Sequence, residues 1–127
     1  MLVGTGMISS TYVVVCNKLP DVSIVGVVSR SGRCPKNLSV PVFDSLANVK
    51  VAFDAIIIAT PNGTHCDLIE EAAKMGKHSL VEKPLDITPE ACDRIAKVSR
   101  QQKVEVSKVC LRRPTKRLFQ GKMHAFF

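Results

Sequence analysis

The sequence lacks several patterns that would indicate other classes of protein. Its five cysteines include no C-x-x-C pair, and no histidine accompanies them at the spacing of metal ligands, so neither a zinc site nor a redox motif is indicated. No apolar run approaches the roughly 18 residues that span a bilayer, and the beginning of the chain lacks the basic region of a signal peptide. We therefore expect reduced thiols, no bound metal, no membrane partner and a cytoplasmic location.

Acidic residues are scarce in the last part of the chain. Residues 1–102 carry 11 basic and 10 acidic side chains, whereas residues 103–127 carry 7 basic ones and a single acid, so this end supplies +6 of the net charge of +7. The basic end, with its phenylalanines, could contact nucleic acid, but the near-neutral remainder argues against a nucleic-acid partner. We expect residues 110–127 to form a basic, poorly structured tail.

The length and composition indicate one soluble globular domain. The chain has 127 residues, of which 46% are hydrophobic and 23% charged, and two full domains do not fit into that length. No internal repeat is present.

Strand-like and helix-like segments alternate, which is typical of βαβ units and a parallel sheet. Strands are predicted at residues 2–3, 22–29, 40–42, 53–60, 78–81 and 104–109, and helices at residues 8–18, 64–75 and 89–102. The pattern predicts an α/β fold over residues 1–109, with a doubly wound parallel sheet in three αβα layers.

The third helix has the clearest start. Thr88 offers a hydroxyl as N-cap, Pro89 suits the first helical position, and Glu90 places an acid in the first turn. In the first helix, a run of β-branched residues weakens the helical pattern.

A glycine-rich turn, GTGMIS at residues 4–9, lies between the first strand and the first helix. The glycines of such a turn let the backbone approach a pyrophosphate, and the helix N-terminus offers it N–H groups. Ser9 stands where the third glycine of the pattern G-x-G-x-x-G is usual. By itself the motif is equally consistent with a tight turn that binds nothing.

The second predicted strand ends in Ser29 and Arg30, where NAD-binding domains usually place an acid. A hydroxyl and a guanidinium can hold a 2′-phosphate, which a carboxylate would repel. The sequence thus favours NADP over NAD, although a solvated arginine in a loop is an alternative.

A third motif, ATPNGTH at residues 59–65, follows the central strand. Ligands of open parallel sheets bind at this carboxyl end, so Asn62 and the loop backbone could reach a cofactor. His65 could contact the cofactor or pack at the start of the next helix. A hairpin at Asn62-Gly63 is disfavoured by that helix.

A fourth motif, Glu82-Lys83-Pro84, follows the strand at residues 78–81. Lys83 could present its ammonium to a reacting hydroxyl or to a nicotinamide. In isolation, such a Glu-Lys pair is more often a surface ion pair.

Taken together, GTGMIS, ATPNGTH and GKHSLVEKP, in this order and spacing, resemble the N-terminal Rossmann-type domain of the glucose-fructose oxidoreductase / inositol dehydrogenase family (Gfo/Idh/MocA) over residues 1–109. The resemblance implies that Lys83 is catalytic, assisting hydride transfer at the nicotinamide. It also implies cofactor contacts from the four motifs, namely Gly4, Thr5, Gly6, Met7, Ile8, Ser29, Arg30, Thr60, Pro61, Asn62, His65, Glu82, Lys83 and Pro84.

Members of the family carry a second α+β domain that supplies the acid/base pair and selects a sugar or polyol substrate, and the present sequence does not contain it. We therefore expect a truncated chain with a shortened first strand, which binds NADP or, alternatively, NAD but is inactive alone. A dinucleotide-binding regulatory or interaction module without hydride transfer is the alternative function.

Overall fold

The computed structural model describes residues 1–109, which form one six-stranded parallel sheet with strand order β3-β2-β1-β4-β5-β6. In chain order the strands are β1 (Leu2–Val3), β2 (Val27–Val28), β3 (Val42–Phe43), β4 (Ala55–Ile58), β5 (His78–Val81) and β6 (Val106–Lys108). Their pairing is parallel throughout. This is the strand order of a dinucleotide-binding Rossmann sheet.

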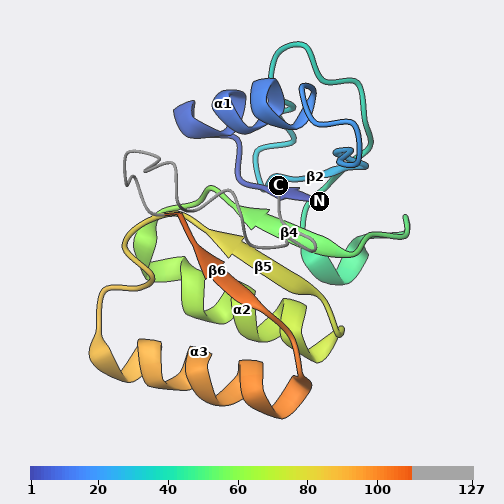
Figure 1. The fold of residues 1–127 in the computed structure, drawn as a ribbon. Helices are drawn as coiled ribbons and strands as arrows, with labels where there is room; N and C mark the ends of the chain where they lie inside the picture. The colour runs from blue at the N-terminus through green and yellow to red at the C-terminus, as the bar shows by residue number, and fades with distance from the viewer. Residues whose placement is uncertain (110–127) are drawn as a thin grey trace, which may run out of the picture.

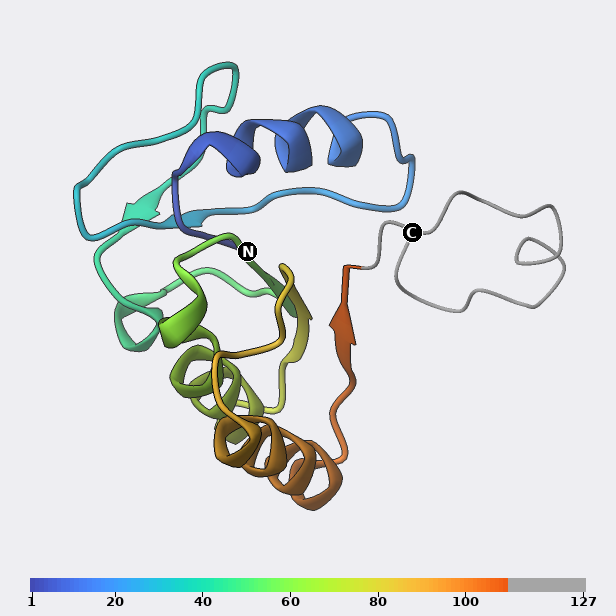
Figure 2. The ribbon, with the colours of Figure 1, turned by 90° about the vertical axis from the view of Figure 1, so that its left-hand side faces the viewer.

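Helices cover both faces of the sheet. These are α1 (Met7–Cys16), α2 (His65–Lys74) and α3 (Pro89–Gln102), with 3₁₀ turns η1 (Leu46–Asn48) and η2 (Asn62–Thr64). Figure 1 and the turned view in Figure 2 show α1 on one side of the sheet and α2 with α3 on the other. The predicted three-layer, doubly wound fold is confirmed.

Two apolar clusters hold the layers together, one on each face of the sheet. The larger includes Ile56 and Ile58 of β4 together with Ile69 of α2, all fully buried. The smaller joins Leu2 of β1 to Val13 of α1. The two residues of β1 enter opposite clusters, since Val3 belongs to the larger one and Leu2 to the smaller one. This alternation is expected for a strand buried on both faces.

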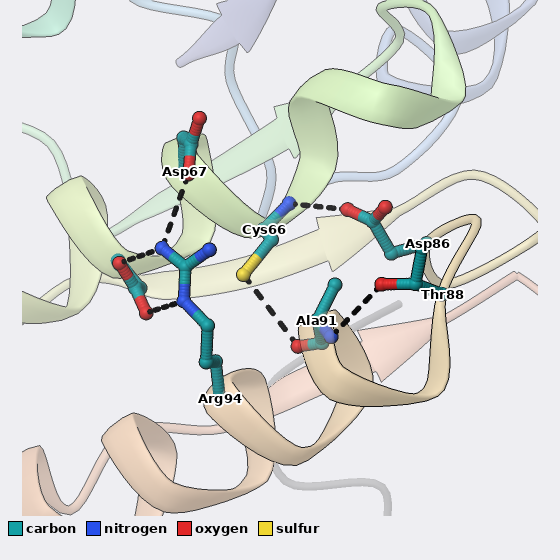
Figure 3. A network of polar contacts seen from close by, with 7 residues as sticks. Cys66, Asp67, Asp86, Thr88, Ala91 and Arg94 are labelled. Carbon is teal, nitrogen blue, oxygen red and sulfur yellow. Dashed lines mark hydrogen bonds and ion pairs between the residues drawn. The ribbon is translucent and has the colours of Figure 1, made fainter.

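Polar contacts fix the two helices of the larger cluster at their N-termini. The Thr88 hydroxyl accepts a hydrogen bond from the Ala91 amide at 3.2 Å, which confirms the predicted N-cap of α3. Helix α2 has no such cap from its own N-cap residue, but the Asp86 carboxylate accepts a hydrogen bond from the Cys66 amide at 2.8 Å (Figure 3). The segment after β5 therefore caps one helix and begins the next.

The second predicted strand is much shorter than expected. Residues 22–29 form a β-ladder only at Val27–Val28 within the described chain, because the first residue of β1 to pair with them is Leu2, opposite Val27. The predicted ends of β4 and β6 shift by one to two residues, β3 begins at Val42, and β5 has the predicted bounds. Strand length depends on the partner strand, which an apolar run does not reveal.

The predicted basic tail, residues 110–127, lies outside the described residues. Among residues 1–109, no helix has both the length and the apolarity needed to cross a membrane.

Candidate dinucleotide-binding site

A cavity of about 680 Å³, here called the carboxyl-end cavity, lies where β1, β2 and β4 end. It brings together residues from three of the four predicted motifs. Of the predicted cofactor residues, those that line it are Gly4, Thr5, Gly6, Ser29, Arg30, Thr60 and Pro61. Such a position, at the carboxyl ends of parallel strands, is where α/β sheets bind ligands.

The first glycine of the turn is required by the backbone. Gly4 has φ of +96°, and a Cβ there would lie 2.5 Å from the Ala59 carbonyl oxygen. Gly6 differs, because a Cβ at Gly6 would come no closer than 4.0 Å to that oxygen. Gly6 therefore leaves open space beside the helix N-terminus, where a ligand could approach the backbone.

The N-terminus of α1 offers hydrogen-bond donors to this cavity. Gly6 is the N-cap and provides no side-chain cap, and the first turn contains no acidic residue. Ser9 is buried and its hydroxyl donates to the Gly6 carbonyl, so a small residue does fit at the place of the third glycine. The side chains of Met7 and Ile8 are exposed and apolar. Their backbone N–H groups are therefore the parts that would donate hydrogen bonds to an anion.

Hydroxyl groups connect the glycine turn to the end of β2. Thr5 Oγ1 lies 3.2 Å from Ser29 Oγ, which lies 3.1 Å from Ser31 Oγ. Ser29 is buried, whereas Arg30 is exposed at the rim of the cavity. A polar ligand at this rim would meet hydroxyls and one guanidinium.

The TPN loop is held by its own threonines. The Thr64 hydroxyl donates to the Pro61 carbonyl at 2.7 Å, so Thr60 must be the donor in the 2.7 Å contact between the Thr60 and Thr64 hydroxyls. Asn62 is exposed at the start of η2 and does not line the carboxyl-end cavity. The structure thus places Thr60 and Pro61 at the cavity and Asn62 beyond it.

His65 joins the two later motifs from a fully buried position. Its Nε2 lies 3.0 Å from the Thr60 carbonyl oxygen, and its Nδ1 lies 3.1 Å from that of Pro84 and 3.2 Å from that of Leu85. A neutral ring donates to one of these loops and an imidazolium to both. The observed contacts make His65 a bridge between loops, and direct contact with a cofactor stays a prediction.

The EKP motif does not line the cavity. It contacts α1, the helix whose N-terminus faces the cavity. Glu82 Oε1 accepts a hydrogen bond from the Tyr12 hydroxyl at 2.6 Å, and Oε2 accepts one from the Lys83 amide at 3.2 Å. Lys83 and Pro84, joined by a cis peptide bond, are exposed. Burial, and then the hydrogen bond to Glu82, raises the pKa of Tyr12 well above its usual range.

Several lining residues escaped the sequence analysis. The cavity is also lined by the carboxylate residues Asp44, Asp67 and Glu71. Asp44 directly follows β3, so its place after a short strand was the one available signal. Hydrogen bonds from Asn48 and then Ser45 lower the pKa of Asp44. The cavity therefore carries charges of both signs.

Within residues 1–109, no three histidine, cysteine or acidic side chains gather as metal ligands would, and the four described cysteines form no disulfide.

A family profile described as an oxidoreductase family with an NAD-binding Rossmann fold (GFO_IDH_MocA) matches residues 1–109. This chain belongs to that oxidoreductase family. Its described residues form the family's domain for binding a nicotinamide dinucleotide, with the strand order and glycine turn reported above.

Relatives match this chain over part of their own length. Rhizopine catabolism protein MocA of Rhizobium meliloti is 28% identical over 110 residues, which are 83% of this chain and 35% of MocA. D-xylose 1-dehydrogenase (NADP+) of Haloarcula marismortui is 43% identical over 47 residues, 37% of this chain and 13% of that enzyme.

A solved structure of the WlbA dehydrogenase of Bordetella pertussis, in complex with NADH and UDP-GlcNAcA, matches with a TM-score of 0.77 at 25% identity. The match covers 85% of this chain and 35% of that one. The chain therefore spans about a third of the length of MocA and WlbA, and less of the xylose dehydrogenase.

Proposed function

We propose that residues 1–109 bind NADP(H) in the carboxyl-end cavity and serve a sugar or polyol oxidoreductase reaction that needs a substrate domain in addition. The observation that carries the proposal is the meeting of the glycine turn, the end of β2 and the TPN loop around one cavity. Relatives in the family include enzymes named for NADP+ and for sugar or inositol substrates.

The residues at the cavity fit the anionic parts of a dinucleotide. The open space at Gly6 and the free N–H groups of α1 suit a pyrophosphate, and Gly4 allows the turn to lie against Ala59. Ser29 and Arg30 suit the 2′-phosphate that distinguishes NADP from NAD. The Asp44 carboxylate lines the same cavity and opposes a phosphate, so neutralising it should strengthen NADP(H) binding.

The EKP and TPN loops would flank the nicotinamide end. A bound nicotinamide dinucleotide supplies or accepts a hydride. Lys83, exposed after β5, would donate a hydrogen bond or a proton from its ammonium to the oxygen of the reacting substrate. The hydrogen bonds of Glu82 to Tyr12 and to the Lys83 amide fix the backbone that carries this lysine.

Turnover requires more than these residues. Within residues 1–109 the histidines are the fully buried His65 and His78 at the start of β5, so the described chain offers no exposed histidine beside Lys83. We expect the isolated chain to bind cofactor without oxidising sugars or polyols. Adding a family substrate domain as a separate or fused unit would supply the substrate contacts.

Titration with NADPH and with NADH, each followed by the fluorescence of the reduced nicotinamide, tests the proposal. NADPH should bind more tightly, and Arg30→Ala should weaken NADPH about tenfold or more, because a charged hydrogen bond is lost, while leaving NADH unchanged. Arg33→Ala is the matched control, since Arg33 is exposed in the same loop and does not line the cavity. Equal affinity for both cofactors would contradict the NADP preference.

A further inference from the structure

Three carboxylate residues line the carboxyl-end cavity, and the binding of phosphates gives them no role. Asp44 follows β3, whereas Asp67 and Glu71 belong to α2. An ionised carboxylate repels a phosphate and can only accept hydrogen bonds, so these side chains suit a part of the ligand that donates. They therefore indicate which part of a dinucleotide reaches this side of the cavity.

The cavity extends from the glycine turn to α2. One end is formed by the glycine turn and the N-terminus of α1, and the other lies between η1 and α2. Figure 2 shows α1 and α2 on opposite sides of the sheet. Because a pyrophosphate at α1 and a ribose at the end of β2 fill the first end, the base of the dinucleotide belongs at the second.

Apolar side chains border this second end. Leu46 of η1 is 1% exposed and Leu68 of α2 is half-buried, and both pack in the larger apolar cluster. Pro61 of the TPN loop lines the same cavity. An aromatic base has two apolar faces and a polar edge, so an apolar border with a few polar groups suits it.

One face of α2 carries polar groups beside this border. Thr64, Leu68 and Glu71 line the cavity at positions i, i+4 and i+7, and Asp67 directly precedes Leu68. Residues three and four apart share a helix face, so the two carboxylates lie one turn apart beside Leu68. A base packed against Leu68 would therefore have a carboxylate at its edge.

The three carboxylates differ in what they already bind. Hydrogen bonds at 2.7 and 3.0 Å reach Asp44 Oδ1, and Arg94 donates to Asp67 Oδ1 at 3.2 Å. Glu71 is half-buried, and within residues 1–109 its carboxylate has neither a hydrogen bond nor an ion pair. Glu71 is therefore the carboxylate that keeps its full capacity to accept hydrogen bonds.

The group that suits Glu71 is a neutral donor on the edge of the base. The phosphates would be repelled, and a ribose at the end of β2 meets the hydroxyl of Ser29 instead. Adenine carries a 6-amino group, which donates outward from the ring edge. A 6-oxo purine carries an oxygen at that place, and the lone pairs of this oxygen would face the carboxylate.

We propose that Glu71 accepts a hydrogen bond from the 6-amino group of an adenine held between Leu46 and Leu68, and so selects adenine over 6-oxo purines. Glu71 is then a specificity-determining residue of the carboxyl-end cavity. The proposal rests on the proposed function, because the base reaches α2 only if the pyrophosphate binds at the glycine turn.

The test compares reduced dinucleotides that carry either a 6-amino or a 6-oxo purine. NADPH is paired with its hypoxanthine analogue, and NADH with its own, so the comparison does not depend on the 2′-phosphate. All four carry the same reduced nicotinamide, whose fluorescence reports binding to the full chain. Glu71→Gln keeps the size of the side chain and removes its charge. Glu105→Gln is the matched control, since Glu105 is exposed and does not line the cavity.

The wild-type chain and Glu105→Gln should bind each adenine form at least about tenfold more tightly than its hypoxanthine form, because a hydrogen bond to a charged group is lost. In Glu71→Gln this preference should fall below about threefold, since a neutral amide can donate to the oxygen as well as accept from the amine. Thermal unfolding should give the three proteins a similar Tm.

Three outcomes would overturn the proposal, and they differ from one another. Equal affinity of the wild-type chain for both members of each pair would mean that no group reads the edge of the base. A preference that survives Glu71→Gln would exclude Glu71, and its loss in Asp67→Asn would then assign the reading to Asp67. Absence of binding by all four dinucleotides would contradict the proposed function itself.

Discussion

The two halves of the sheet are built differently. In the first half, residues 1–43, each strand has two residues, and a single helix covers the strands. In the second half, residues 55–108, β4 and β5 have four residues each, and two capped helices pack on each other. Both halves contribute to the walls of the carboxyl-end cavity, whereas the second half holds most of the larger apolar cluster.

The difference follows from how the helices are held. Helices α2 and α3 are joined by Arg94, whose guanidinium donates to the carboxylates of Glu70 and Asp67, and the Asp86 carboxylate caps α2 (Figure 3). Helix α1 begins without a side-chain cap, and its N-terminus faces a cavity. The second half therefore holds most of the apolar packing, and the first half presents the uncapped N-terminus of α1 to the cavity.

The largest effect is expected from matched truncations in the two halves. Ile69→Ala removes a fully buried side chain of α2 and should lower the free energy of unfolding by about 2–5 kcal/mol. Ile24→Ala, at the cavity of about 570 Å³ beside Met1, should cost less than about 2 kcal/mol, because its side chain already borders open space. Urea unfolding of both variants measures the difference, and equal costs would remove the contrast between the halves.

A smaller effect is expected where the halves are tied together. Tyr12→Phe removes the hydroxyl that holds Glu82, and should lower the free energy of unfolding by about 2 kcal/mol, as for a hydrogen bond to a charged group. A double-mutant cycle with Glu82→Gln isolates the pair. Additive effects of the two substitutions would show that the hydrogen bond contributes nothing.

The same residue gives a pH dependence. The pKa of Tyr12 is raised in the folded state above its ordinary value of 10.0. The stabilisation of the fold by Tyr12 is therefore fully present below pH 10 and is lost as the pH rises toward the folded-state pKa. The wild-type chain should therefore lose stability above pH 10 more steeply than Tyr12→Phe. Parallel curves for the two proteins would contradict the assignment.

The smallest effect is expected at the exposed ion pairs of the second half. Arg94→Gln should lower Tm slightly at neutral pH, since such surface pairs contribute little. The hydrogen bond from Arg94 lowers the pKa of Glu70 below its ordinary value of 4.5, so the benefit is present above that pH and disappears as the pH falls through the lower folded-state pKa. Thermal unfolding from pH 7 to pH 3 should show the two proteins converging; a difference that persists at pH 3 would exclude this pair as its source.

The sequence predicted the second half better than the first. Strand β5 has the predicted bounds and Thr88 caps α3 as predicted, because both signals are local. The strand predicted at residues 22–29 failed because its length depends on β1, which pairs only from Leu2 onward. Apolar runs report burial and do not report the partner that completes a ladder.

The candidate site shows the same limit. The glycine turn and the TPN loop reach one cavity as predicted from their positions after parallel strands. Tyr12 could not be found in this way, since its hydroxyl meets a carboxylate 70 residues away. Asp44 lies at the end of a two-residue edge strand, where the sequence signal for a strand is weakest.

The measurement that tests the central claim most directly is the NADPH affinity of Gly6→Ala. A Cβ at Gly6 meets no protein atom closer than 4.0 Å, so the variant should fold with unchanged Tm, yet the methyl group would occupy the space assigned to the pyrophosphate. The account predicts saturable NADPH binding by the wild-type chain and an affinity at least about tenfold lower for Gly6→Ala. Equal affinity of the two folded proteins, or no binding by the wild-type chain at millimolar NADPH, would contradict it.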